Sequence, residues 1–207
     1  MTLLRPKDAP SLAPLTAALD AATPEDRKAW VRSLGGAEQK HLYALAQGNP
    51  VHVADLVGAD GEVCIGDGRN GLPVLNRFQK RFSRLGSEVV GYNDNREIAG
   101  LLSPLIAWFT GPGHFLAYDS PEVPGEVWID YRTVSTAQHP DFPPLLDNEH
   151  GFRSLVFGNM VDILRRVSQH VFIGDAFKNL PRTTPMGLGC RIGSKLDTAP
   201  FAICLRS

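Results

Sequence analysis

The stretch TGPGHFLAYDSPEVPGEVWIDYRTV, residues 110–134, decides the predicted fold because it has the pattern of two strands joined by a turn. Residues 114–118 are aromatic and aliphatic, whereas residues 119–125 contain two prolines and a glycine, which suit a turn. Residues 126–134 then alternate, so that Tyr131 lies on one face and Trp128 and Asp130 lie on the other. Strands with so short a connection pair antiparallel, and we place this hairpin at the centre of the fold.

Short apolar segments on both sides of the hairpin predict further strands. They are residues 62–65, 88–92, 105–110, 153–157, 171–173 and 201–205. Because turns rather than helices of regular length connect them, they predict an antiparallel sheet that curls or closes. The last segment, FAICL, is apolar on both faces, so we expect it to be buried at the closure of the sheet. A helix is expected at residues 160–167, with Asp162 on its wet side.

The first fifty residues differ from the rest because they are rich in alanine and poor in β-branched residues. They predict helices over residues 12–19, 24–34 and 37–47, and Thr23 and Pro24 form a good start signal for the second. The predicted protein is therefore of the α+β class. A helical N-terminal segment, 1–50, covers a strongly bent, barrel-like antiparallel sheet in a β-rich domain, 51–207, with one or two helices.

Composition excludes several classes of function. A net charge of −1 gives no overall attraction to nucleic acid. No apolar run approaches the roughly 20 residues that a membrane-spanning helix needs. Three cysteines without a C-x-x-C motif are typical of a reduced compartment, so we expect a cytoplasmic location. The oligomeric state stays open.

The most basic segment is LNRFQKRFSRL, residues 75–85, and it fits either a helix or a strand. On a helix, its cations form one stripe that suits an anionic ligand or an acidic protein partner; they are Arg77, Lys80, Arg81 and Arg84. On a strand, Lys80 and Arg84 instead share a face with Phe78 and Phe82. In a barrel, these four side chains would all point inward or all point outward. Residues 98–109 are equally open between helix and strand.

The preferred function is a non-catalytic module that binds a small ligand or a partner through a barrel-like sheet. The expected ligand-binding residues are Trp128, Tyr131 and the four cations of residues 77–84. The alternatives are an acid–base enzyme, in which Asp130 orients His114, and an interaction protein that uses the basic stripe. No cofactor is expected, because the glycine-rich residues 187–193 lack the lysine of a phosphate loop. No metal is expected either, because the polar residues of the loop 135–150 match no ligand spacing.

Overall fold

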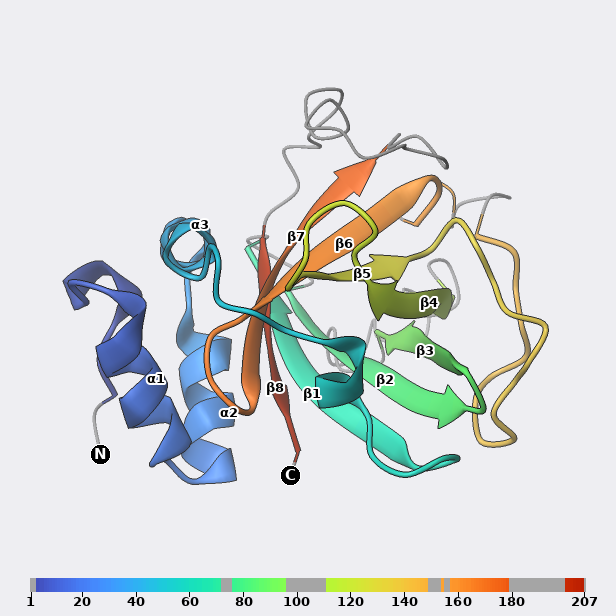
Figure 1. The fold of residues 1–207 in the computed structure, drawn as a ribbon, viewed down its shortest axis with the longest axis horizontal. Coiled ribbons are helices and arrows are strands. Elements are labelled where there is room, and N and C mark those ends of the chain that lie inside the picture. The colour runs from blue at the N-terminus through green and yellow to red at the C-terminus, as the bar shows by residue number, and fades with distance from the viewer. Residues whose placement is uncertain are drawn as a thin grey trace, which may run out of the picture.

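The computed structural model of the chain describes residues 3–71, 76–95, 111–148, 154, 157–178 and 200–206. Eight antiparallel strands in this part form a closed barrel in which each strand pairs with the next along the chain, and the eighth pairs with the first (Figure 1). The barrel-like sheet predicted from the sequence is therefore confirmed. The strands are β1 Val63–Asn70, β2 Arg77–Leu85, β3 Glu88–Asp94, β4 Gly113–Asp119, β5 Val127–Asp130, β6 Met160–Arg166, β7 Val171–Lys178 and β8 Phe201–Leu205.

Three α-helices precede the barrel, as predicted: α1 Leu12–Asp20, α2 Pro24–Ser33 and α3 Gly36–Leu45. Short 3₁₀ helices, η1 Pro6–Asp8 and η2 Val53–Leu56, flank them. Thr23 caps α2, because its hydroxyl accepts a hydrogen bond from the Asp26 amide at 3.1 Å. Among the described helices, none is long and apolar enough to cross a membrane.

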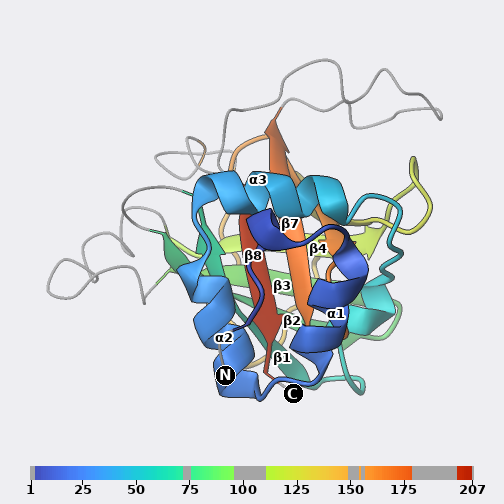
Figure 2. The ribbon, with the colours of Figure 1, turned by 90° about the vertical axis from the view of Figure 1, so that its left-hand side faces the viewer.

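The helices cover the outer face of β7 and β8 (Figure 2). Leu15, Leu19 and Leu42 from the helices share one buried cluster with Val171 of β7 and Ala202 of β8. This packing explains why the last strand is apolar on both faces, since its other face lines the barrel. The predicted burial of residues 201–205 at the closure of the sheet is confirmed by the pairing of β8 with β1 and β7.

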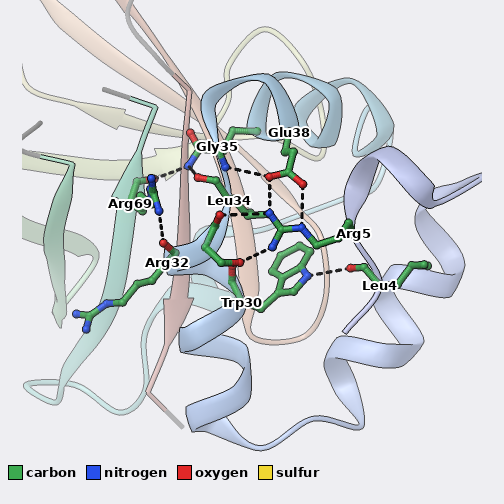
Figure 3. A network of polar contacts seen from close by, with 10 residues as sticks. Leu4, Arg5, Trp30, Arg32, Leu34, Gly35, Glu38 and Arg69 are labelled. Atoms are coloured by element: carbon green, nitrogen blue, oxygen red, sulfur yellow. Dashed lines mark hydrogen bonds and ion pairs between the residues drawn. The ribbon is translucent and has the colours of Figure 1, made fainter. Parts of the chain in front are cut away.

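Polar contacts fix the helices to each other and to the barrel (Figure 3). Arg5 forms an ion pair with Glu38 of α3, while the indole nitrogen of Trp30 donates to the Leu4 carbonyl at 2.9 Å. Arg69 of β1 donates to the Arg32 carbonyl near the end of α2. Because these bonds join elements far apart in sequence, they set the position of the helices on the barrel wall.

The barrel interior is filled mainly by aromatic rings, which fit because glycines face them. A Cβ atom added at Gly91 would lie 2.3 Å from the Phe115 ring, and one at Gly174 would lie 2.3 Å from the Phe201 ring. Such alternation of small and large residues is typical of narrow barrels. Val51 and Leu56, which precede β1, belong to the same buried cluster and help to close the end where β1 begins.

The structure decides one open assignment and overturns another. Residues 77–85 form strand β2, so of the two alternatives for this segment the strand is correct, and the four cations do not make a helical stripe. The helix predicted at residues 160–167 is wrong. Met160–Arg166 is strand β6, buried on both faces, and such a strand carries no clear period of two. The strand predicted at residues 105–110 and the open question at 98–109 lie outside the described residues, as does most of 153–157.

Candidate functional site

A lysine lies inside the barrel, in the middle of its aromatic core. Lys80 belongs to β2, and its side chain shares the inward face with Phe78 and Phe82. Only 1% of Lys80 is exposed. Lysine is almost never buried to this degree without a partner, because removing its charge from water is costly. The buried amine of Lys80 therefore needs acceptor groups around it.

Three oxygen atoms surround the Lys80 amine. Its Nζ donates to the Asn93 side-chain oxygen at 2.9 Å, to the Tyr131 hydroxyl, and to Asp162 Oδ2 at 2.8 Å. The Tyr131 hydroxyl in turn donates to Asp162 Oδ2 at 3.1 Å. An ammonium group has three donors, so each has an acceptor here. We call Lys80, Asn93, Tyr131 and Asp162 the lysine cluster.

Aromatic rings enclose the same amine. Nζ lies 4.8 Å from the centre of the Phe201 ring, 5.1 Å from Tyr131, 5.4 Å from Phe115 and 5.5 Å from Phe78. The face of an aromatic ring attracts a cation, most strongly where water is excluded. The rings therefore partly replace the water that the buried amine has lost.

Burial shifts the acid–base behaviour of the cluster. Loss of water lowers the pKa of Lys80, and the adjacent Asp162 carboxylate opposes this effect by favouring the ammonium form. Burial also raises the pKa of Tyr131 well above its ordinary value, and Asp162 adds to the rise because it repels a phenolate. The Tyr131 hydroxyl therefore stays protonated and can keep its hydrogen bond to Asp162.

A hollow of about 360 Å³ opens beside the cluster, where β3 ends and β4 begins. Aromatic, amide and carboxylate side chains line it together with two prolines and a glycine. The lining residues are Tyr92, Asn93, Asp94, Asn95, Gly111, Pro112, Asp141, Phe142 and Pro143. Asn93 belongs both to the hollow and to the lysine cluster, because it lines the hollow and also accepts the hydrogen bond from Lys80. The volume lies in the range of small-molecule sites.

Asn148 ties the loop after β5 to the same end of the barrel. Its amide nitrogen donates to the carbonyls of His114, at 2.7 Å, and Tyr131, at 2.8 Å. Asn148 is 1% exposed, and its amide oxygen has no hydrogen-bond partner among the described residues. These bonds hold the backbone of Tyr131, and therefore help to hold its ring in the lysine cluster.

The structure brings together two of the residues that the sequence suggested for ligand binding, Lys80 and Tyr131. Trp128 lies on the outer face of β5 in a separate buried cluster. Arg77 is exposed at the start of β2, and Arg81 forms an ion pair with Asp94 at 3.2 Å on the outer face. Arg84 lies at the opposite end of β2 from Arg77. The four cations thus do not act as one surface.

His114 and Asp130, the suggested acid–base pair, have other partners in the structure. Both oxygens of Asp130 accept hydrogen bonds from Arg132, and one also accepts from the Tyr118 hydroxyl at 2.7 Å. The ring nitrogen Nε2 of His114 lies 3.1 Å from the Pro144 carbonyl oxygen. Burial and the neighbouring Asp130 raise the pKa of Tyr118. Each of the two residues therefore has a hydrogen-bonding partner of its own.

Sequence reasoning missed Asn93, Asp162 and Asn148. Asn93 directly follows the strand predicted at residues 88–92, and Asp162 is expected on the wet side of the helix predicted at residues 160–167. One signal points to Asp162, because a single lysine between two inward phenylalanines needs a carboxylate from another strand. Asp162 is the carboxylate on the inward face of β6, between Met160 and Leu164.

A comparison with protein-family models finds no match, and neither does a comparison with the sequences of curated proteins. The class of the protein is therefore defined by its architecture. It is an eight-stranded antiparallel barrel with consecutive strands adjacent, a helical cap on one side and a buried lysine cluster inside.

Proposed function

We propose that the protein is a non-catalytic module that binds a small molecule in the hollow at the end of β3. The observation that carries the proposal is the position of Asn93. It lines the hollow, and its side-chain oxygen accepts a hydrogen bond from Lys80.

The lining indicates the chemistry of the ligand. Tyr92 and Phe142 form an edge-to-face pair with ring centres 5.0 Å apart, and so offer an apolar surface. Asn95 and Asp141 add an amide and a carboxylate on the same hollow. This combination suits a small polar molecule that has hydrogen-bond donors and one apolar face.

The lysine cluster supports this site by fixing Asn93. The Asn93 side-chain oxygen accepts a hydrogen bond from Lys80 Nζ at 2.9 Å. A side chain held in this way loses little freedom when a ligand binds, which favours affinity. In this proposal Lys80 positions a binding residue and does not itself touch the ligand.

The proposal can be tested by screening a library of small polar metabolites with thermal shifts, followed by calorimetry on the compounds that stabilise the chain. Asn95→Ala and Asp141→Ala should each weaken binding by about fivefold or more, because each removes a hydrogen-bonding group from the hollow. Lys40→Ala, on the exposed face of α3, is the matched control and should bind normally. Equal affinity in all three variants would place the ligand elsewhere.

The same experiment addresses the enzyme alternative that uses His114 and Asp130, which stays a hypothesis. The bound compound should be recovered chemically unchanged after prolonged incubation. Conversion of the compound, lost in a His114→Gln variant that still folds, would favour catalysis over simple binding.

A further inference from the structure

A second group of charges lies on the outside of the barrel, where α2 covers β1 and β8. Asp67 of β1 is 1% exposed and accepts several hydrogen bonds. Arg206 donates to both of its oxygens, at 2.7 and 2.8 Å. Lys28 of α2 lies 2.9 Å from Oδ2, and Arg32 lies 3.3 Å from Oδ1. One carboxylate is therefore in contact with three cations.

A fourth cation lies nearby and is more deeply buried. Arg27 of α2 is 4% exposed, and none of the described carboxylates pairs with it. Its guanidinium donates to the Ala22 carbonyl at 2.8 Å, but its Nε has no partner among the described residues. The pKa of the Cys204 thiol is raised, chiefly by burial, and the nearby charges of Arg27 and Lys28 oppose this rise. Arg27 does not line the hollow beside Asp67, so it adds positive charge nearby without contacting a molecule there.

A hollow of about 380 Å³ opens at this place. It is lined by Pro24, Glu25, Lys28, Asp67, Cys204, Leu205 and Arg206. The side chains of Lys28 and Arg206 are 33% and 45% exposed, so both can turn a donor toward a molecule in the hollow. The first turn of α2 also borders it, and the N-terminal end of a helix carries partial positive charge.

We propose that this hollow binds a phosphate group. The three cations in contact with Asp67 exceed the two carboxylates, Asp67 and Glu25, so the site keeps a net positive charge. Lys28 and Arg206 are the direct contacts, because they combine hydrogen-bond donors with access to the hollow. Arginine and lysine are the usual partners of phosphate oxygens, and arginine can donate to two of them at once. This site is separate from the hollow beside Asn93.

The test uses the full chain and calorimetry with inorganic phosphate, at constant ionic strength set by chloride. Phosphate should bind and raise the melting temperature of the wild type. Lys28→Gln and Arg206→Gln should each weaken binding by about tenfold, because each removes a charge-assisted hydrogen bond. Lys40→Gln changes the charge equally at an exposed position on α3 and should leave the affinity unchanged.

Glu25→Gln gives a prediction of opposite sign, which a purely structural role of these residues would not produce. Removing this carboxylate from the hollow should tighten phosphate binding, because it removes a like charge. Glycerol 3-phosphate, tested in parallel, separates the two sources of the group. Tighter binding of the ester indicates a phosphorylated small molecule, and tighter binding of inorganic phosphate indicates the free ion.

Two results would overturn the proposal. One is the absence of phosphate binding to the folded wild type at constant ionic strength. The other is an equal effect of Lys28→Gln and Lys40→Gln, which would mean that phosphate acts only through general screening of charge. If Lys28→Gln fails to fold, the proposal can still be tested with Glu25→Gln, which must raise the affinity for phosphate.

Discussion

Lys80 and Asp162 form an ion pair of 2.8 Å between strands that lie opposite each other in the barrel. Counted in either direction around the sheet, β2 and β6 are four strands apart. The pair thus crosses the full width of the interior. Its two side chains are 2% and 4% exposed, so water does little to replace either partner.

Removing one charge of this pair should destabilise the protein strongly. Asp162→Asn leaves a buried lysine without its carboxylate, which should cost about 3–5 kcal/mol of unfolding free energy. The double variant Lys80→Met, Asp162→Leu removes both charges and should recover most of that loss. Urea denaturation measures both, and Asp141→Asn, at a side chain that is 83% exposed, is the control. A loss below about 1 kcal/mol in Asp162→Asn would mean that Lys80 does not depend on this carboxylate.

Two interior glycines should respond differently to the same substitution. In Gly91→Ala the new methyl group would lie 2.3 Å from both the Arg81 carbonyl and the Phe115 ring, so the wall must shift. In Gly66→Ala its nearest neighbours, on Leu205 and Ile203, lie at 3.5 and 3.6 Å. Thermal unfolding should show a loss of about 1–3 kcal/mol for the first and less than about 1 kcal/mol for the second. Equal effects would contradict the described packing.

Asp67 should make stability depend on pH in the acid range. Its buried carboxylate loses water, but Arg206 and Lys28 more than offset this and lower its pKa from 3.8 to about 2. The charged form is therefore favoured by folding. The stabilisation, roughly 2 kcal/mol, is present above about pH 4 and is lost as the pH falls through 2.

The comparison of wild type with Asp67→Asn isolates this effect from that of other carboxylates. Urea unfolding between pH 6 and about pH 2 should show a large difference at pH 6 that shrinks on acidification. A constant difference across this range would show that the cations around Asp67 do not lower its pKa.

Deleting residues 201–207 should prevent a native fold. The deletion removes Phe201, Ile203 and Leu205 from the interior, each contributing about 1.5–3 kcal/mol by burial, against a typical total stability of about 5–15 kcal/mol. It also leaves β1 and β7 as open edges, which favour aggregation. We expect insoluble chain, or a molten state that binds a hydrophobic dye. Soluble chain with a cooperative transition would mean that β8 is peripheral, and Arg206→Gln is the control that keeps the strand.

The elements that the sequence predicted well are those whose signals are local. Thr23 and Pro24 mark the start of α2, and the prolines and glycine of residues 119–125 mark the turn between β4 and β5. The alternation in residues 126–134 placed Tyr131 on one face and Trp128 on the other, as observed. Such signals depend on residues within a few positions of each other, so they can be recognised without knowledge of the rest of the fold.

The lysine cluster depends instead on contacts that no local pattern encodes. Lys80 and Asp162 are 82 residues apart in sequence and meet only because the sheet closes. The helical spacing in residues 160–167 was misleading because Val161 and Ile163 are covered on the outside of the barrel, while Leu164 lies inside. A strand buried on both faces has no wet face to reveal its period. The sequence therefore contained the members of the site without their arrangement.

The pairing of β8 with β1 has a consequence for the newly made chain. The helices α1, α2 and α3 are synthesised before the barrel strands, yet the wall against which they pack contains strand β8. On the ribosome, the apolar sides of the helices and the open edge of β1 stay unpaired until residues 201–205 have been synthesised. Domains whose contacts join distant parts of the sequence fold slowly, and they expose hydrophobic surface that favours aggregation until folding is complete. Native structure should therefore appear only once residues 201–205 have been made, in one step that closes the barrel, buries Lys80 and docks the helices together.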